Sequence, residues 1–217
     1  MQTWYFDLDG TLLDFSVPFE IIYERALARL GLEPRGFETF DERFGEVFGN
    51  VAEPYTQAIA AIDLAVEPAA FSETLIETEI DHAVAAPGAG AILESLSSAG
   101  HQVGILTNGL GRVQRGKLET VGLADRVDAV VVSSEVGAWK PDADIYRLAE
   151  ERLAADEYTF VADDLERDLV PALECGWRGV YVGPDAEGLE ASGPGSDLEA
   201  RLSQVETLEA ITSLDQW

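Results

Sequence analysis

From Pro87 onward, short apolar runs with strand character alternate with segments of helical periodicity, and a similar apolar run opens the chain. Strands rich in β-branched residues and separated by helices are typical of a parallel sheet with helices on both faces. The expected strands are 3–6, 102–106, 129–132, 158–161 and 179–182, and the expected helices are 92–98, 112–121, 143–153 and 165–175. The pattern predicts an α/β fold with a doubly wound, Rossmann-like parallel sheet.

The segment between the first strand and Pro87 has a different pattern of apolar residues. Apolar residues recur at helical spacing in three or four stretches, at 19–30, 40–48, 58–62 and 71–80. We expect no strand between Asp14 and Ala86. The predicted organisation is therefore a core domain of residues 1–13 and 87–217, with residues 14–86 inserted as a helical cap domain. Towards the C-terminus we expect a loop around 188–195, then a short strand at Val205 and a helix over 208–214.

The chain is strongly acidic, with 41 Asp and Glu residues against 14 Lys and Arg residues and a net charge of −27. Such a surface disfavours nucleic acid and anionic membranes, whose binding depends on cationic contacts. The charge runs through every segment instead of forming a tail. This distribution suggests a halophilic protein from a salt-saturated cytoplasm, because at about 1 M salt the Debye length falls to roughly 3 Å.

Targeting signals and disulfides are not expected. No apolar run reaches the roughly 18 residues that cross a bilayer, and the first residues lack the basic and apolar regions of a signal peptide. The single cysteine, Cys175, has apolar neighbours and is interpreted as a small buried side chain. We expect a cytoplasmic protein that is a monomer or a homodimer.

The first polar cluster, Asp7-Leu8-Asp9-Gly10-Thr11, directly follows the first strand. The glycine allows a sharp turn that can direct carboxylates into a crevice. Two carboxylates this close favour different roles, one as a nucleophile that binds a cation and the other as a proton-holding general acid. The alternative is that these are ordinary turn residues.

Two further clusters follow later strands. Thr107-Asn108-Gly109 offers a hydroxyl and backbone N–H groups that suit a phosphate oxygen, although a strand-to-helix turn capped by Asn108 explains it equally well. Lys140 precedes Pro141 and is one of only two lysines in the chain. A lysine retained at this position suggests that a compact positive charge is needed there to bind an anion. The alternative interpretation is a solvated lysine in a loop.

The fourth cluster, Ala162-Asp163-Asp164-Leu165-Glu166-Arg167-Asp168, follows the strand at 158–161. Acidic groups at a strand end, together with a lysine, suit Mg²⁺, which binds one or two carboxylates, waters and phosphate oxygens. An N-capping Asp in a charged first turn would explain one of these acids but not the whole cluster.

Taken together and in this order, the four clusters resemble the haloacid dehalogenase-like hydrolases, in the branch with a helical cap after the first strand. The resemblance covers essentially the whole chain. One stretch of the chain is similar to the nucleotidase-like and sugar-phosphatase-like members of that branch. The residues that carry this similarity are Leu106-Thr107-Asn108-Gly109, Gln114, Lys117-Leu118, Gly122-Leu123, Gly137 and Lys140-Pro141-Asp142.

The resemblance implies a role for each matching residue. Asp7 would attack phosphorus, and Asp9 would protonate the leaving alcohol and then activate water. Thr107 and the backbone N–H groups of Asn108 and Gly109 would hold the phosphoryl group, with Thr11 also on the substrate side. Lys140 would neutralise charge and orient Asp7. Asp7, the carbonyl of Asp9, and Asp163 would bind Mg²⁺ with support from Asp168, and a contribution from Asp164 is left open.

Asp9 also bears on the reaction, because the family's dehalogenases lack a carboxylate at this position. The implied activity is hydrolysis of a small phosphate ester through an aspartyl phosphate. The alternatives are a sugar phosphomutase and a catalytically inactive binding protein. The chain departs from the family pattern at Ala162, where glycine is usual, and at Asp164, where a small hydroxyl residue is common.

Overall fold

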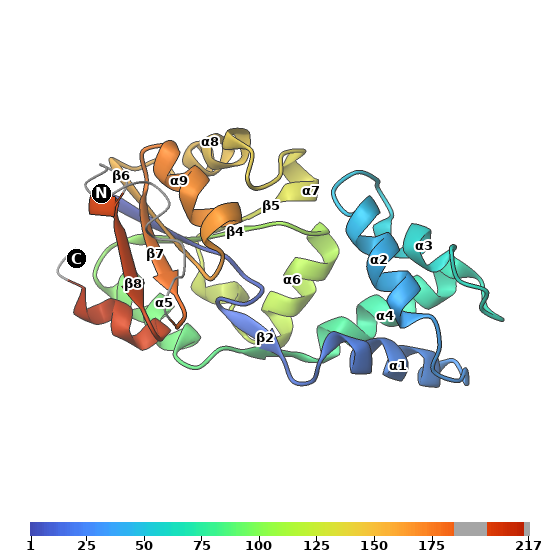
Figure 1. Cartoon of the computed structure of the whole chain (residues 1–217). Helices are drawn as coiled ribbons and strands as arrows, with labels where there is room; N and C mark the ends of the chain where they lie inside the picture. Colours follow the sequence, from blue (N-terminus) through green and yellow to red (C-terminus); the bar gives the residue numbers. More distant parts are fainter. Residues whose placement is uncertain (185–198, 215–217) are drawn as a thin grey trace. The chain divides into compact units, whose positions relative to one another are not determined.

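The computed structural model describes residues 1–184 and 199–214 of the chain. Its centre is a six-stranded sheet with the order β5-β4-β1-β6-β7-β8, in which every neighbouring pair is parallel (Figure 1). The strands are β1 (Gln2–Phe6), β4 (Gln102–Thr107), β5 (Ala129–Val132), β6 (Glu157–Ala162), β7 (Arg178–Val182) and β8 (Leu202–Val205). The prediction of a doubly wound α/β sheet is confirmed.

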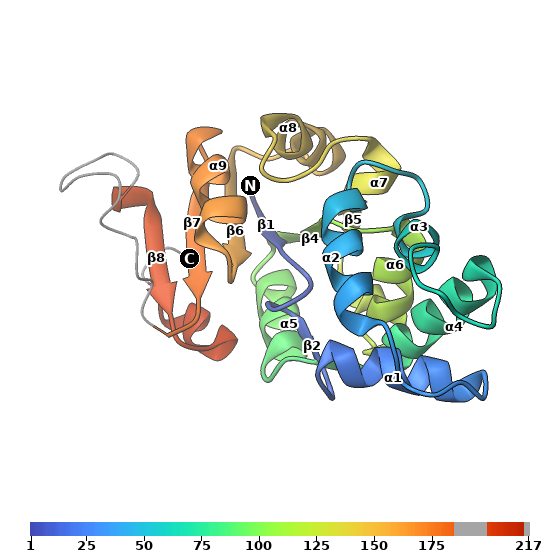
Figure 2. The same cartoon turned by 45° about the vertical axis from the view of Figure 1, so that its right-hand side comes forward.

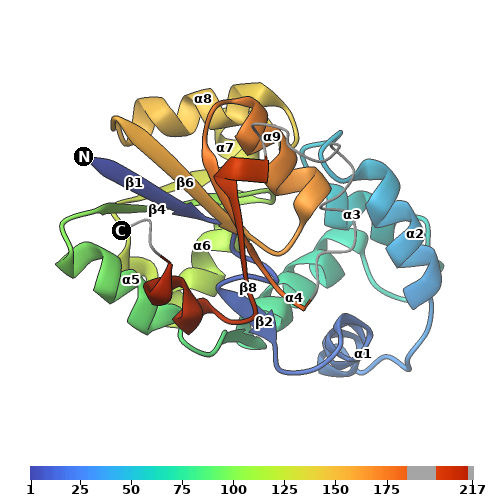
Figure 3. The ribbon, with the colours of Figure 1, turned by 60° about the vertical axis from the view of Figure 1, so that its left-hand side comes forward.

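Helices cover both faces of this sheet, as Figure 3 shows. Alternate residues of β1 point to opposite faces, so Trp4 and Phe6 join one apolar cluster and Tyr5 joins the other. The first cluster packs under α5 (Ala89–Ser98) and α6 (Gly111–Thr120), and the second under α8 (Ala143–Arg152) and α9 (Val170–Glu174). Because β1 is buried on both faces, its last three residues, Trp4-Tyr5-Phe6, are all apolar instead of alternating with polar ones.

The chain divides into two compact units, a core unit of Met1–Asp14 with Ala85–Trp217 and a helical unit of Phe15–Val84. The helices of the second unit, visible in Figure 2, are α1 (Phe19–Arg29), α2 (Phe37–Val47), α3 (Pro54–Ile59) and α4 (Pro68–Asp81). Its interior is aromatic, with Tyr23 lying 5.3 Å from Phe40 and 5.1 Å from Phe71 between ring centroids. Proline begins α3 and α4, where its missing N–H has no helical partner to lose.

The expectation of no strand between Asp14 and Ala86 is wrong. Two three-residue strands, β2 (Leu13–Phe15) and β3 (Ala83–Ala85), form a small second sheet where the chain passes from one unit to the other and returns. Three residues are too few to show a period-two pattern, so pairing between distant segments decides these strands. The expected loop at 188–195 lies outside the described residues.

The predicted helix at 165–175 is also not uniform. It begins as a π-helix, η2 (Leu165–Leu169), and continues as α9. Pro171 has no N–H to bond the carbonyl of Arg167 four residues earlier. The hydroxyl of Tyr146 lies 3.5 Å from this carbonyl and donates to the neighbouring carbonyl of Asp168 at 2.8 Å. The short elements α7 (Ser133–Val136), η1 (Ala124–Arg126), η4 (Glu199–Arg201) and η5 (Leu208–Ser213) complete the described fold.

Among the described residues, no helix combines the length and apolar character required to cross a membrane.

Candidate active site

The three central strands bring the predicted clusters to one edge of the sheet. In β1, Phe6 pairs with Ile105 of β4 on one side and with Val161 of β6 on the other. The residues just beyond these pairs therefore emerge together at the carboxyl ends of parallel strands. Because the chain leaves β1 towards β4 and β5 and later returns to β6, this is the switch point at which doubly wound sheets bind ligands.

Asp7 lies at the centre of this edge and is buried, with 3% of its surface exposed. Its backbone N–H donates to the carbonyl of Val161, which fixes the turn out of β1. The ammonium group of Lys140 lies 2.8 Å from an oxygen of Asp7 and 2.8 Å from an oxygen of Asp168. One buried cation thus links two buried carboxylates.

A second cation, Arg167, reaches the same pair from a more exposed position. Its guanidinium lies 3.1 Å from Asp168 and 3.6 Å from Asp7. Asp168 itself is completely buried. The π-helix that begins after Asp164 places Arg167 and Asp168 at this edge, in line with the frequent occurrence of π-turns at functional sites.

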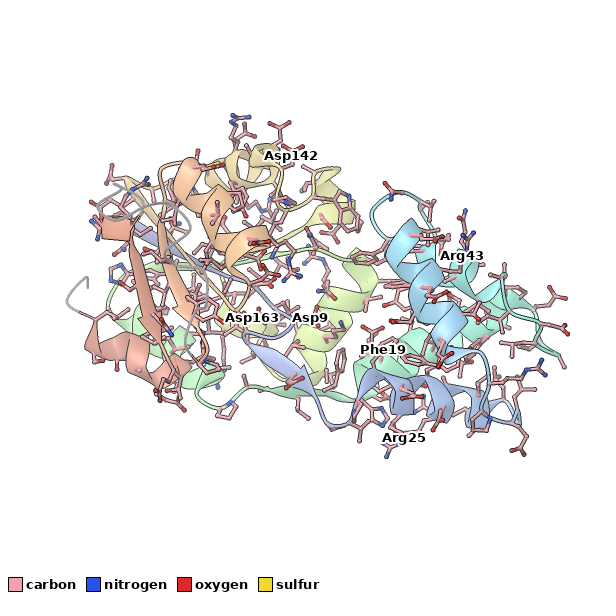
Figure 4. All side chains as sticks on the ribbon, in the orientation of Figure 1. Asp9, Phe19, Arg25, Arg43, Asp142 and Asp163 are labelled. Atoms are coloured by element: carbon pink, nitrogen blue, oxygen red, sulfur yellow. The ribbon has the colours of Figure 1, made fainter. Side chains whose placement is uncertain are left out.

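Asp7, Asp163 and Asp168 offer three carboxylate oxygens that lie within 4.8 Å of one another. Oxygen donors of this charge and spacing fit a hard divalent cation such as Mg²⁺. The turn after β1 is shaped to admit Asp163, because a Cβ on Gly10 would lie 2.3 Å from its Oδ2 atom. Thr11 donates its hydroxyl hydrogen to the other oxygen of Asp163 at 3.1 Å. Asp9 and Asp163 are labelled in Figure 4.

Asp164, by contrast, caps the π-helix by accepting a hydrogen bond from the backbone N–H of Arg167. It is not part of the carboxylate cluster found among the described residues. The geometry therefore favours Asp168 over Asp164 as the supporting acid.

The electrostatics of the cluster reflect its burial. Removal from water raises the pKa of Asp7 to about 6, an effect that Lys140 opposes and the charge of Asp168 reinforces. Burial also raises the pKa of Asp163, while the hydrogen bond from Thr11 acts in the opposite direction. Both carboxyl groups thus bind protons more readily than free aspartate does, and a bound cation would reverse this tendency.

The Asp9 carboxylate has its own partners on α6. Lys117 Nζ lies 2.9 Å from Asp9 Oδ1, and Gln114 Nε2 lies 2.6 Å from Asp9 Oδ2. The same Gln114 nitrogen lies 2.9 Å from the hydroxyl oxygen of Thr107. Asp9 is therefore tied to the end of β4 and not to the carboxylate cluster, so only its backbone carbonyl is left as the predicted metal ligand.

The loop after β4 differs in detail from the expectation. The side chain of Asn108 donates to the carbonyl of Lys140 and accepts from its N–H, at 3.0 and 2.9 Å. The N–H of Gly109 donates to the hydroxyl of Ser133 at 2.9 Å. Asn108 thus positions the backbone of Lys140, and the Gly109 donor already has a protein partner.

The sequence placed Gln114 and Lys117 within the family resemblance and Arg167 within the fourth cluster, but it assigned none of these three residues a role in the site. Lys117 could have been found by the argument used for Lys140, since these are the only two lysines in the chain. Arg167 carried no comparable signal, because arginine is the common cation of this sequence and pairs with acids over much of the surface.

Residues 1–176 match the family model described as haloacid dehalogenase-like hydrolase. The chain belongs to this family. Among curated relatives, ribulose-1,5-bisphosphate 5-phosphatase of Halopiger xanaduensis is 33% identical over 132 residues, which cover 59% of this chain and 55% of the relative. Hexitol phosphatase A of Escherichia coli is 28% identical and is matched over 84% of this chain and 83% of its own length.

A solved structure with the same fold is the HAD phosphatase from Thermococcus onnurineus, with a TM-score of 0.68 and 25% identity over 98% of this chain and 97% of that one. The predicted membership of the haloacid dehalogenase-like hydrolases is confirmed. The match to the Halopiger enzyme spans little more than half of that relative's length.

Proposed function

We propose that this haloacid dehalogenase-like chain is a Mg²⁺-dependent phosphatase of small phosphate monoesters, with Asp7 as the nucleophile. The observation that carries the proposal is the placement of Asp7, which is buried at the sheet edge, paired with Lys140 and grouped with Asp163 and Asp168. The names of the two relatives reported above support the same class of reaction, since each is called a phosphatase.

In the first step, a carboxylate oxygen of Asp7 forms a bond to phosphorus while the bond from phosphorus to the ester oxygen breaks. Asp9 gives a proton to the departing oxygen, which leaves as an alcohol. In the second step, Asp9 takes a proton from water, whose oxygen bonds to phosphorus and displaces the Asp7 carboxylate. The net reaction consumes one water and yields the alcohol and inorganic phosphate.

Several residues would support these steps. Lys140 lies where it can hold Asp7 and balance the negative charge of the phosphoryl group. The hydroxyl of Thr107, at the end of β4, is proposed to bind a phosphoryl oxygen, with the N–H of Asn108 beside it. Thr11 is proposed to act mainly through Asp163, to which it donates.

Asp7, Asp163 and the carbonyl of Asp9 are proposed to hold Mg²⁺, with Asp168 behind them. A bound Mg²⁺ would offset the negative charge of a phosphate ester as it approaches these carboxylates. The helical unit is proposed as the cap expected from the sequence. The names of the two relatives, ribulose-1,5-bisphosphate 5-phosphatase and hexitol phosphatase A, support a small phosphorylated metabolite as the substrate.

The test is a phosphate-release screen over nucleotides, sugar phosphates and phosphoglycolate, with Mg²⁺ in molar KCl. Asp7→Asn removes the nucleophilic charge and is expected to lower turnover at least about 1,000-fold. Asp125→Asn, which changes an exposed aspartate of η1 in the same way, is the matched control and is expected to keep full activity. Release of an isomeric phosphate ester instead of free phosphate would indicate a mutase, and metal binding without turnover would indicate an inactive binding protein.

A further inference from the structure

The chain has two lysines in 217 residues, and both are buried at the candidate site. Each one pairs with a different aspartate of the Asp7-Leu8-Asp9 sequence. Lys140 contacts Asp7 at 2.8 Å, and Lys117 contacts Asp9 at 2.9 Å. A protein whose other side-chain cations are arginines has therefore kept lysine at the two places where a compact charge meets these two carboxylates.

Two side chains hold the Asp9 carboxylate, one at each of its oxygens. Lys117 binds one oxygen and Gln114 binds the other. The two donors are three residues apart on α6, so they project from the same face of that helix. Gln114 also bonds the hydroxyl of Thr107, which ties the position of Asp9 to the end of β4.

Stability alone gives little reason for this arrangement. The Lys117 side chain is 4% exposed, whereas the Asp9 side chain is 38% exposed. Asp9 could therefore be hydrated without any partner, while Lys117 loses most of its hydration to reach it. Pairs of this kind often add nothing to stability, because the cost of desolvation offsets the Coulomb attraction.

We propose that Lys117 and Gln114 are positioning residues that orient the Asp9 carboxylate for proton transfer at the leaving oxygen. This inference rests on the proposed phosphatase function. Proton transfer requires the acid within hydrogen-bond reach of the ester oxygen, and a carboxylate held at both oxygens has a defined direction. Without the hold, Asp9 would rotate freely in its half-exposed position.

The experiment compares two substrates that differ in their need for an acid, p-nitrophenyl phosphate and an alkyl phosphate such as glycerol phosphate. The nitrophenolate leaves readily without a proton, whereas an alkoxide does not. The values of kcat/KM are compared because they report the steps up to release of the alcohol. Lys117→Met and Gln114→Leu are expected to lower kcat/KM about 10- to 100-fold for the alkyl ester and less than about 3-fold for the aryl ester.

Arg115→Met is the matched control, since it removes a cation from the same helix that pairs with Glu135 at the surface. This variant is expected to leave kcat/KM unchanged for both substrates. Lys117→Arg is expected to show the same low kcat/KM for the alkyl ester as Lys117→Met, because a planar guanidinium does not replace a compact ammonium in a buried position. In a chain that already carries Asp9→Asn, Lys117→Met is expected to lower kcat/KM little further, because Lys117 is proposed to act through the Asp9 carboxylate.

Equal losses on the two substrates, or no loss, would overturn the inference while leaving the phosphatase proposal intact. A wild-type chain that releases no phosphate from any ester would overturn both. Thermal melting of each variant shows whether it folds. If Lys117→Met does not fold, Gln114→Leu provides the same comparison, and failure of both to fold would assign the pair a structural role and reject the inference.

Discussion

At the scale of single residues, the two aspartates of the first turn lie in different surroundings although only Leu8 separates them. Asp7 is buried and shares Lys140 with Asp168, while Asp9 is half-exposed and faces α6. Different environments are what allow two neighbouring carboxylates to take different chemical roles. The proposed division into nucleophile and acid is consistent with this asymmetry.

The raised pKa of Asp7 leads to a prediction about metal binding. With a pKa of about 6 in the metal-free protein, Asp7 is about half protonated at pH 6. A divalent cation binds the ionised form, so Mg²⁺ is expected to release protons at pH 6 and far fewer at pH 8. The measurement is pH-stat titration with MgCl₂. Asp125→Asn should behave as wild type, and a release at pH 6 that is as large in Asp7→Asn as in the wild type would contradict the assignment.

The same shift has a consequence for stability without metal. Because burial raises the pKa of Asp7 above its ordinary value, protonation favours the folded state. Its contribution to the free energy of unfolding is greatest below the ordinary pKa of an aspartate and is lost as the pH rises through about 6. Lys140 limits this loss by pairing with the charged form.

At the scale of elements, the turn after β1 brings the first and fourth clusters together. Gly10 has a φ of +83°, which L side chains rarely adopt, and its N–H donates to the carbonyl of Leu13. The absence of a Cβ leaves room for the Asp163 carboxylate at the end of β6. One glycine thus allows the turn and also allows the close approach.

Gly10→Ala is expected to weaken Mg²⁺ binding at least about 10-fold, because the new methyl group displaces Asp163. Gly122→Ala is a matched control, since Gly122 has a φ of +70° and nothing within 4 Å of its would-be Cβ. Both variants should lose about 1–2 kcal/mol of stability from backbone strain, but only the first should lose metal affinity. Calorimetric titration with MgCl₂ measures this, and equal affinities would refute the role of the close approach.

At the scale of the whole molecule, the net charge of −27 dominates. Arginines on the surface pair with acids, as Arg29 does with Asp81 and Arg126 with Glu94, but most carboxylates have no cation to balance them. Such exposed pairs contribute little individually. Mutual repulsion of the carboxylates therefore opposes the folded state in dilute buffer.

Raising KCl from dilute buffer to about 2 M is expected to increase the melting temperature by about 5 °C or more, because screening removes this repulsion. Differential scanning calorimetry measures the change. Sucrose of equal osmolality serves as a control for general preferential exclusion and should produce a smaller increase. A melting temperature that does not respond to KCl would contradict the interpretation of the charge as a salt adaptation.

Much of the fold was accessible from local patterns. The apolar run of β1 and the alternation after Pro87 predicted the parallel sheet, and the helical spacing between 19 and 80 predicted the helices of the second unit. The strands β2 and β3 and the π-helix at Leu165–Leu169 were not accessible. The first two depend on pairing between residues about 70 positions apart, and the π-helix has a contact with a distant segment, since the hydroxyl of Tyr146 donates to the carbonyl of Asp168.

By itself, the sequence determined which chemical groups follow each strand, because burial of a strand and the turn after it are encoded locally by apolar runs, glycine and aspartate. Only the tertiary structure decided the partners of those groups. Lys140 lies between Asp7 and Asp168, whereas Lys117 and Gln114 hold Asp9. These pairings join residues about 30 to 130 positions apart, and the order of strands in the sheet, which no local pattern contains, sets the distances between them.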